Sequence, residues 1–416
     1  MRAYQIEGGV PLHGTVTIHG AKNSALPILA ATLVCRGVCT IHNCPKISDV
    51  NVALEILNSL GCKTKREGDT VIVDTYAATG TEISERLMQK MRAAVIFLGA
   101  LLTRFGEAKL SHPGGCRLGE RPLDFHLLGL RLMGAECRQE GANLHCQGAN
   151  MHGATIALPF PSVGATENLI LAALRSPEDT IICNAAREPE IDDLIGFLCA
   201  CGAEISGGGT SVLRIRGGKS LHGAEYTIMP DRMEAATYLC AAAATRGRIT
   251  LEQTCPEHLR TVLCALEYGG CGIREASQTI ELFCERLCAV SPIITAPYPG
   301  FPTDAQAPLM AALATAEGTS VFNETIFSDR FRHVPALCAM GANICATKRH
   351  AIVRGVSRLH GADVEATDLR GGAAMVIAAL AAEGKSRITK TEHMERGYAD
   401  FVQALQGCGA KIVILE

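Results

Sequence analysis

A sixfold repeat restricts the fold of this chain more than any other feature of its sequence. Six times, an apolar helix-like stretch ends in a glycine that a strand-like segment follows, at Gly61, Gly134, Gly202, Gly270, Gly341 and Gly409. Successive glycines are 73, 68, 68, 71 and 68 residues apart, so six units fill the 416 residues almost completely. We expect each glycine to stop its helix in the left-handed conformation, which glycine adopts without a steric cost.

A second signature agrees with this period. A histidine-glycine pair precedes a short strand-like segment at His13, His152, His222 and His360. In the first unit, a glycine-aspartate turn signal stands before the β-branched run 70–73, which predicts a hairpin. Each unit is therefore expected to run strand, helix, strand, helix, strand, strand. Three such units would close around a shared core of helices, which predicts an α/β protein of two pseudo-threefold domains.

The composition indicates a globular protein with two cores. With 48% hydrophobic residues, a chain of 416 residues can bury two substantial cores. The net charge of −3 does not indicate the basic surface that nucleic-acid binding requires. The absence of Trp argues against a surface on which bases could stack. The first residues lack the apolar core of a signal peptide, and the longest uncharged apolar run, 371–382, is too short to span a bilayer. We expect a cytoplasmic protein without a nucleic-acid or membrane partner.

The 19 cysteines do not form a recognisable ligand pattern. They follow neither the pairing of CxxC motifs nor the spacing of a small disulfide scaffold. Most are expected to be reduced and buried as small apolar residues. The glycine-rich frames of the P-loop and of dinucleotide-binding folds are absent as well. No metal site and no cofactor are predicted.

Polar residues recur where the first helix of each unit is expected to begin. These positions are Lys22 with Asn23, Arg92, the segment 162–166 around Gly164, Asp231 with Arg232, Asp304 and Arg370. Helix N-termini carry partial positive charge and free N–H groups, which suit anionic ligands. If the three helix starts of each domain point the same way and the domains face one another, all six surround one cleft.

Three of these residues carry charges that local structure explains poorly. Lys22 opposes the dipole of the helix that it begins, which favours a functional cation. Asp304 follows a turn rich in proline and glycine, and is either an N-capping residue or an acceptor for the proton of a sugar hydroxyl. Arg370 precedes an almost wholly apolar helix. Together with Arg330 and Arg396, it indicates a small, highly anionic substrate, because guanidinium groups match carboxylate and phosphate oxygens.

The segment 111–125 is expected to be a functional loop. Its glycines and prolines exclude a helix or a central strand, and a loop of this length is typical of a lid over a site. It carries Cys116 beside Arg117 and Arg121. Neighbouring arginines favour the thiolate form of a cysteine. Cys116 is therefore a candidate nucleophile or proton donor.

Taken together, these segments resemble the UDP-N-acetylglucosamine 1-carboxyvinyltransferase family. The resemblance rests on AKNSALP, HPGGCRLGERPLDFHLLGL, SVGATENL, AAREPEIDDL, FPTDAQAPLMAALA, ETIFSDRFRHVPAL, TDLRGGAAMVIAALAAEG and ERGY, and it covers the chain from end to end. It implies a two-domain inside-out α/β barrel of six βαβαββ repeats, with pseudo-threefold symmetry in each domain. One domain would span residues 20–229, and the other residues 1–19 and 230–416.

The resemblance also implies an activity and roles for residues. Enolpyruvyl would pass from phosphoenolpyruvate to the 3′-hydroxyl of UDP-N-acetylglucosamine, with release of phosphate and no cofactor. Cys116, Asp304 and Lys22 would be catalytic, with Cys116 as the general acid and fosfomycin target and Asp304 as the base. Phosphoenolpyruvate would be held by Lys22, Asn23, Arg121, Arg330, Arg370 and Arg396. The nucleotide sugar would be held by Asn23, Arg92, Arg121, Pro122, Leu123, Asp124, Phe125, Ser162, Val163, Gly164, Asp304 and Ile326. Phe160 stands where some members carry a lysine near the uridine.

Two alternatives remain open at this point, and so does the oligomeric state. The nearest rival activity is that of the shikimate-3-phosphate enolpyruvyl transferases, which share the fold and the donor. The cysteine lid and the GERPLDFH segment stand against it. The other alternative is a non-catalytic α/β repeat scaffold, which would have no reason to place charged residues at matching loop positions.

Overall fold

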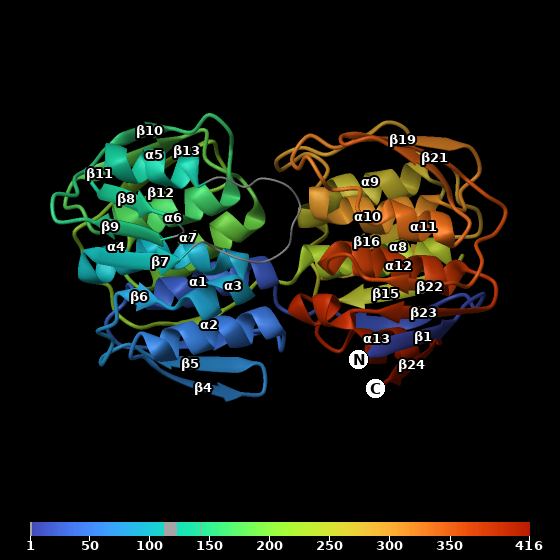
Figure 1. Ribbon diagram of the computed structural model, residues 1–416, viewed down its shortest axis with the longest axis horizontal. Helices are drawn as coiled ribbons and strands as arrows, with labels where there is room; N and C mark the ends of the chain where they lie inside the picture. The colour runs from blue at the N-terminus through green and yellow to red at the C-terminus, as the bar shows by residue number, and fades with distance from the viewer. Residues whose placement is uncertain (1, 112–122, 142) are drawn as a thin grey trace. The chain divides into compact units, whose positions relative to one another are not determined.

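The chain divides into two units, each with its own sheets and buried helices (Figure 1). The structure is a computed structural model that describes residues 2–111, 123–141 and 143–416. We call the described part of residues 20–229 the N-terminal unit, and residues 2–19 with 230–416 the C-terminal unit.

The N-terminal unit repeats one order of elements three times. The first round contains α1 (Lys22–Thr32), β3 (Val38–His42), α2 (Ser48–Ser59), β4 (Lys63–Glu67) and β5 (Thr70–Asp74). The second contains β6 (Glu82–Ile83), α3 (Glu85–Lys90), the 3₁₀-helix η1 (Arg92–Ile96), α4 (Phe97–Phe105), β7 (Glu107–Ser111), α5 (Asp124–Leu132), β8 (Glu136–Glu140) and β9 (Asn143–Gln147). The third contains β10 (Thr155–Ala157), α6 (Val163–Ala173), β11 (Asp179–Cys183), α7 (Pro189–Ala200), β12 (Glu204–Ser206) and β13 (Val212–Arg216), and β14 (Glu225–Thr227) follows it.

The C-terminal unit follows the same order. It begins with β1 (Ala3–Glu7) and β2 (His13–Thr17), and resumes with α8 (Arg232–Ala244), β15 (Arg248–Glu252), η2 (Pro256–Leu259), α9 (Arg260–Tyr268), β16 (Gly272–Ala276) and β17 (Thr279–Phe283). Its next round contains β18 (Ile293–Ile294), α10 (Thr303–Leu313), β19 (Thr319–Asn323), α11 (Val334–Ala339), β20 (Asn343–Ala346) and β21 (His350–Arg354). The last contains β22 (Asp363–Glu365), α12 (Leu369–Ala381), β23 (Lys385–Thr389), η3 (Thr391–Arg396), α13 (Phe401–Gly407) and β24 (Lys411–Leu415).

Within the described residues, the strands form six four-stranded sheets, each with one parallel pair and two antiparallel pairs. Three strands join a sheet from outside their own round. β14 pairs in parallel with β3 in the N-terminal unit, β2 pairs with β15 in the C-terminal unit, and β1 lies between β23 and β24. The strand β2, which begins with His13-Gly14, belongs to the sheet of β15, in agreement with the expected grouping of residues 1–19 with 230–416. Equivalent opening strands carry the same local pattern, so only the tertiary pairing distinguishes their sheets.

The repeated glycines adopt the expected left-handed conformation. Their φ angles are 94°, 84°, 99°, 92°, 92° and 91°, and each glycine follows the end of α2, α5, α7, α9, α11 or α13 by two residues. The predicted turn between β4 and β5 is confirmed as well, with Glu67 paired to Thr70 across Gly68. Local steric rules therefore determine where these helices end.

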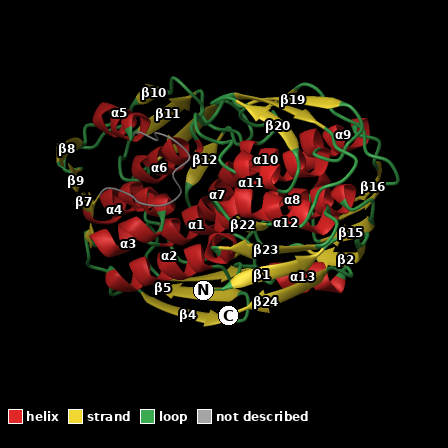
Figure 2. Ribbon diagram, turned by 45° about the vertical axis from the view of Figure 1, so that its right-hand side comes forward, coloured by secondary structure: helices red, strands yellow, loops and turns green. Residues whose placement is uncertain are grey.

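The first helices of the rounds form the cores. In the C-terminal unit, α8, α10 and α12 contact one another and are buried along nearly their whole length. In the N-terminal unit, α4 contacts both α1 and α6, and all three are largely buried. The sheets cover the outside of each unit (Figure 2), with alternate residues facing inward, as in β3 and β15. No helix of the three described ranges is long and apolar enough for a membrane span.

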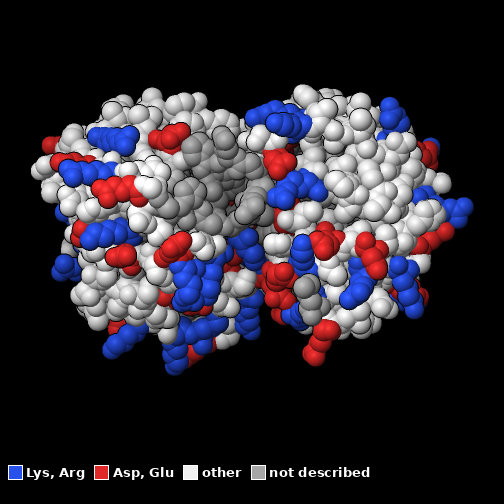
Figure 3. All heavy atoms as spheres, viewed as in Figure 1, with Lys and Arg blue, Asp and Glu red and all other residues white. Residues whose placement is uncertain are grey.

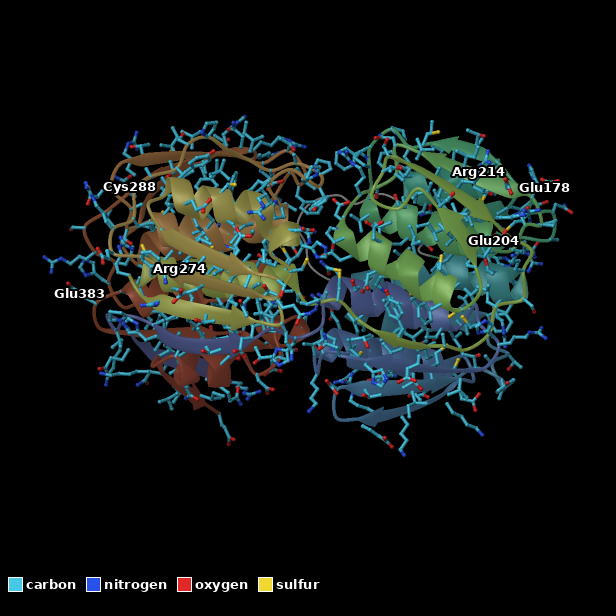
Figure 4. All side chains as sticks on the ribbon, turned by 180° about the vertical axis from the view of Figure 1, so that it is seen from behind. Glu178, Glu204, Arg214, Arg274, Cys288 and Glu383 are labelled. Atoms are coloured by element: carbon cyan, nitrogen blue, oxygen red, sulfur yellow. The ribbon has the colours of Figure 1, made fainter. Side chains whose placement is uncertain are left out.

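Charges on the outer surfaces form exposed pairs of mixed sign. On the visible face of each unit, Lys and Arg are interspersed with Asp and Glu (Figure 3). Figure 4 shows Glu383 at the outer edge of the C-terminal unit, where its carboxylate lies 3.0 Å from Arg358 and both side chains are about 60% exposed. Exposed pairs of this kind contribute at most about 1 kcal/mol each. The charges that can build a site are the buried ones at the helix N-termini.

Two exposed glycines at the end of α13 provide a test of the helix-stop argument. An added β-carbon meets no atom within 4 Å at Gly407 or at Gly409, but only Gly409 has a positive φ, of 91°. Gly409→Ala is expected to lower the free energy of unfolding by about 1–2 kcal/mol. Gly407→Ala, inside the helix, is expected to raise it by about 0.5–1 kcal/mol. Urea denaturation measures both, and equal effects of the same sign would contradict the argument.

Candidate active site

Lys22 is the first residue of α1, as predicted, and it is paired. Its Nζ lies 2.7 Å from Oδ2 of Asp49, in the first turn of α2, and the two side chains are only 12% and 3% exposed. A cation at a helix N-terminus opposes the dipole, and a buried charge needs a partner, so Asp49 offsets both costs. The pair fixes the ammonium group at the start of α1, beside the exposed Asn23. Asp49 was not singled out in the sequence.

The predicted residues at the starts of α5 and α6 lie together. Ser162 caps α6, where its Oγ accepts a hydrogen bond from the N–H of Ala165 at 3.4 Å. A β-carbon built on Gly164 would lie 3.4 Å from Cε1 of His126, in the first turn of α5. The first turn of α5, with Leu123 before it and Asp124 and Phe125 at its start, therefore adjoins the first turn of α6.

Asn168 holds this corner together. Its Nδ2 donates to Nδ1 of His126 at 2.9 Å and to the carbonyl of Val95 at 3.0 Å, and its Oδ1 accepts from the N–H of Gly99 at 2.7 Å. One buried amide therefore ties α5 and α6 to η1 and α4. Arg92 begins η1, as expected of a helix start, and its side chain is outside the described part. Cys116, Arg121 and Pro122 also lie outside the described residues.

Two acidic side chains in α6 and α7 have raised pKa values. Burial, together with Glu190 and Glu188, raises the pKa of Glu167 in α6 well above its usual range. Burial also raises the pKa of Asp193, while hydrogen bonds from Met229 and Tyr226 oppose the rise. Asp193 lies in the segment AAREPEIDDL and Glu167 in SVGATENL, which were quoted only for the family resemblance.

In the C-terminal unit, Asp304 lies between two arginines. Its Oδ1 is 2.9 Å from Nη2 of Arg330, and its Oδ2 is 3.2 Å from Nε of Arg370. Both guanidinium groups are almost fully buried, at 2% and 3% exposure, whereas Asp304 is 31% exposed. The N-cap of α10 is Pro302, so the interpretation of Asp304 as a capping residue is wrong. The carboxylate of Asp304 instead lies between two buried guanidinium groups and remains partly exposed to solvent.

Hydrogen bonds to the backbone fix the guanidinium group of Arg330. It donates from Nε and Nη2 to the carbonyl of Thr303 at 3.3 and 3.1 Å, and Thr303 Oγ1 donates to Oε2 of Glu324 at 2.9 Å. The other oxygen of Glu324 accepts the N–H groups of Ile326 and Phe327 at 2.8 and 3.0 Å. One buried carboxylate thus links the segment of Ile326 to the start of α10.

Arg370 remains charged in a buried position. Burial alone would lower its pKa, but Tyr398, Asp304 and Asp231 raise the pKa of Arg370 overall. Its Cζ lies 5.3 Å from the centre of the Tyr398 ring, which provides a cation–π contact. Its Nη1 has no hydrogen-bond acceptor among the described residues, so one buried donor is unsatisfied. Such a donor suits an anionic oxygen. Arg396 ends η3, two residues before Tyr398, and is half-buried.

Comparison with known proteins identifies the class. The chain matches the family of EPSP synthase (3-phosphoshikimate 1-carboxyvinyltransferase) over residues 6–405. It is 47% identical over 414 residues to UDP-N-acetylglucosamine 1-carboxyvinyltransferase 2 of Caldanaerobacter subterraneus, with 99% of each chain covered. It is 46% identical over 410 residues to the UDP-N-acetylglucosamine 1-carboxyvinyltransferase of Nitratidesulfovibrio vulgaris, with 98% of each covered.

Solved structures agree with this class. The enolpyruvyl transferase NikO from Streptomyces tendae superposes with a TM-score of 0.90 at 26% identity, over 99% of this chain and 98% of that one. EPSP synthase from Acinetobacter baumannii shares the fold, with a TM-score of 0.76 at 19% identity over 100% of both chains. The chain belongs to the enolpyruvyl transferase family, which confirms the resemblance seen in the sequence and the α/β class of the fold.

The buried His333 interacts electrostatically with Arg330, and the pH dependence of protein stability tests how strongly this histidine resists protonation. This side chain is fully buried, and burial lowers its pKa to about 4, with Asp368 raising it and Arg330 lowering it further. The unfolded chain, with a pKa near 6.5, binds the proton first, so stability is expected to fall as the pH drops from about 6.5 to 4. The contribution of His333 to this loss is about 3 kcal/mol.

His333→Gln is therefore expected to make the free energy of unfolding less dependent on pH in this window. Urea denaturation between pH 7 and pH 4 measures it. His13→Gln is the control, since His13 is exposed and should leave the wild-type slope unchanged. Parallel curves for wild type and His333→Gln would show that this imidazole does not resist protonation.

Proposed function

We infer that this chain transfers the enolpyruvyl group of phosphoenolpyruvate to the 3′-hydroxyl of UDP-N-acetylglucosamine and releases phosphate. The observation that carries this inference is the identity of 43–47% over 98–99% of the chain to proteins named for that reaction. The reaction is the first committed step of peptidoglycan precursor synthesis, and its two substrates are the partners that the chain requires.

The two units correspond, in this proposal, to the two domains of an inside-out α/β barrel. Their boundaries fall at residues 20–229 and at 1–19 with 230–416, and each domain contains three βαβαββ repeats with pseudo-threefold symmetry. The same strand order in six sheets supports this arrangement.

Phosphoenolpyruvate is held, in this proposal, by cationic side chains and one amide. Lys22, Asn23, Arg121, Arg330, Arg370 and Arg396 bind its phosphate and carboxylate groups. The partners already described for Lys22, Arg330 and Arg370 support these roles, because a fixed cation binds an anion without first losing side-chain freedom. The unsatisfied Nη1 of Arg370 is a donor for one of the substrate's oxygens.

Asp304 and Cys116 move the protons of the addition step. Asp304 accepts the proton of the 3′-hydroxyl as its oxygen attacks C2 of phosphoenolpyruvate, while the thiol of Cys116 gives a proton to C3. The resulting tetrahedral adduct then loses a proton from its methyl group and expels phosphate, which restores the double bond. The contact of Asp304 with two guanidinium groups supports this role, since they hold its oxygens in a fixed orientation.

The nucleotide sugar binds at the starts of η1, α5 and α6. Its proposed binding residues are Asn23, Arg92, Arg121 to Phe125, Ser162 to Gly164, Asp304 and Ile326. The corner that Asn168 ties together supports a preformed surface here. Phe160 supplies no charge, so the uridine contact that lysine makes in some members is absent.

A single assay distinguishes this activity from its rivals. Phosphoenolpyruvate is mixed with UDP-N-acetylglucosamine or with shikimate 3-phosphate, and the released phosphate is measured. We expect release with the nucleotide sugar alone. Release with shikimate 3-phosphate would assign the chain to the activity named by the family description, and no release with either would favour a non-catalytic scaffold.

Asp304→Asn tests the proposed base. Asparagine preserves the shape of the side chain but cannot accept the hydroxyl proton, so kcat is expected to fall by about 10²–10⁴-fold. Asp363→Asn is the control, because this exposed aspartate lies in β22 of the same unit, outside the site. If Asp304→Asn keeps kcat within about threefold of wild type while remaining folded, Asp304 is not the base.

A further inference from the structure

Three buried cysteines meet in the N-terminal unit, away from the helix starts. Cys35 lies in the turn after α1, Cys39 lies in β3, and Cys201 is the C-cap residue of α7. Their three Sγ atoms all lie within 4.8 Å of one another, and each residue is 0% exposed. Within residues 2–111, 123–141 and 143–416, this is the one group of three or more Cys, His, Asp and Glu side chains spaced for a metal ion.

The spacing of the sulfurs matches a thiolate metal centre. With metal–sulfur bonds of about 2.3 Å, ligands around one ion lie roughly 4 Å apart, so small side-chain rotations would complete the centre. Thiolates select soft ions such as Cu(I) and Zn(II). Structural zinc takes four protein ligands, and catalytic zinc keeps an open position. The described residues supply three buried sulfur ligands. This number suits an ion that binds three ligands better than one that needs four.

We propose that Cys35, Cys39 and Cys201 bind one soft metal ion through three thiolates, and that Cu(I) is the ion that fits best. The ion would join the end of α1, the strand β3 and the end of α7, and so link the first and third rounds of this unit. None of these residues belongs to the proposed catalytic or substrate-binding set. The site therefore acts on metal binding and stability rather than on the transfer reaction.

The charges around the cluster favour this chemistry. Binding of Cu(I) by three thiols forms three metal–sulfur bonds and releases three protons to solvent, which leaves the cluster with a net charge of −2. The cationic side chain of Arg104 lies beside the cluster and opposes that charge.

Arg104 and His222 lie beside the cluster. Nη1 of Arg104 donates to the carbonyl of Cys35 at 3.2 Å, and its Nη2 donates to the carbonyl of Thr75 at 2.9 Å. The N–H of His222 donates to the carbonyl of Cys201 at 3.0 Å, and its side chain acts electrostatically on Cys39. The guanidinium group of Arg104 is thus attached to the backbone of Cys35, one of the cysteines that would carry the added negative charge.

Other cysteine groupings do not offer this arrangement. Cys137 and Cys146 lie opposite each other in β8 and β9 with their sulfurs 2.6 Å apart, and Cys271 and Cys284 form a similar pair. Each provides only two sulfurs. They make a matched comparison inside the same chain, because a two-thiol pair binds a three-coordinate ion incompletely.

Competitive titration of the full-length protein tests the proposal. Reduced protein is titrated with Cu(I) under anaerobic conditions against a chromophoric Cu(I) chelator. Wild type is expected to take up one tightly bound equivalent more than Cys39→Ala or Cys201→Ala, whose affinity at this site falls by at least about 100-fold. Cys240→Ala, which removes a buried cysteine of α8 in the other unit, should match wild type. X-ray absorption of the one-equivalent complex should show three sulfur neighbours.

A second experiment measures the unfolding temperature with Cu(I) and the competition between Cu(I) and Zn(II). One equivalent of Cu(I) is expected to raise the unfolding temperature of wild type and of Cys240→Ala, but not that of Cys39→Ala. If either alanine variant fails to fold, Cys39→Ser and Cys201→Ser replace it. Equal Cu(I) uptake by wild type and the cluster variants would overturn the site, and displacement of Cu(I) by equimolar Zn(II) would overturn the choice of ion. Neither result depends on enolpyruvyl transfer.

Discussion

Complete burial of the central helices is the constraint on which the rest of this structure depends. α8, α10 and α12 in one unit, and α1, α4 and α6 in the other, are covered on nearly all sides. Their sides must then be apolar, because a buried polar side chain without a partner is costly. Polar residues concentrate at their first turns, where free N–H groups and the helix dipole meet the surface.

The same constraint explains why the charges of the site are paired. Lys22 without Asp49, or Arg370 without Asp304, would leave a cation in a poorly solvated position. Pairing removes that penalty and also holds each side chain in one orientation. In each unit, a buried cation is therefore held in one position by a carboxylate. Groups that are fixed in this way need no reorganisation to interact with a charge.

Local features of the sequence predicted much of this structure. The glycine stops, the hairpin after Gly68 and the helix starts at Lys22 and Arg370 were correct, because each depends on backbone sterics or on residues within one turn. The charged members of the site were identified for the same reason, since a charge beside an apolar helix is visible in the sequence. Their partners were not. Arg330 and Arg370 reach Asp304 from other elements, and no local pattern specifies such contacts.

By itself, the sequence determined the period of the repeat, the α/β class and the family, because these follow from glycine conformation, hydrophobic pattern and motifs. Tertiary structure alone decided which sheet each equivalent strand joins, and so placed β14 beside β3 and β2 beside β15. It also decided that Cys201 meets Cys35 and Cys39, where the sequence showed no ligand pattern. The physical reason is the same in both cases. Identical local signals can be satisfied by several long-range partners, and only the packing of the whole unit selects among them.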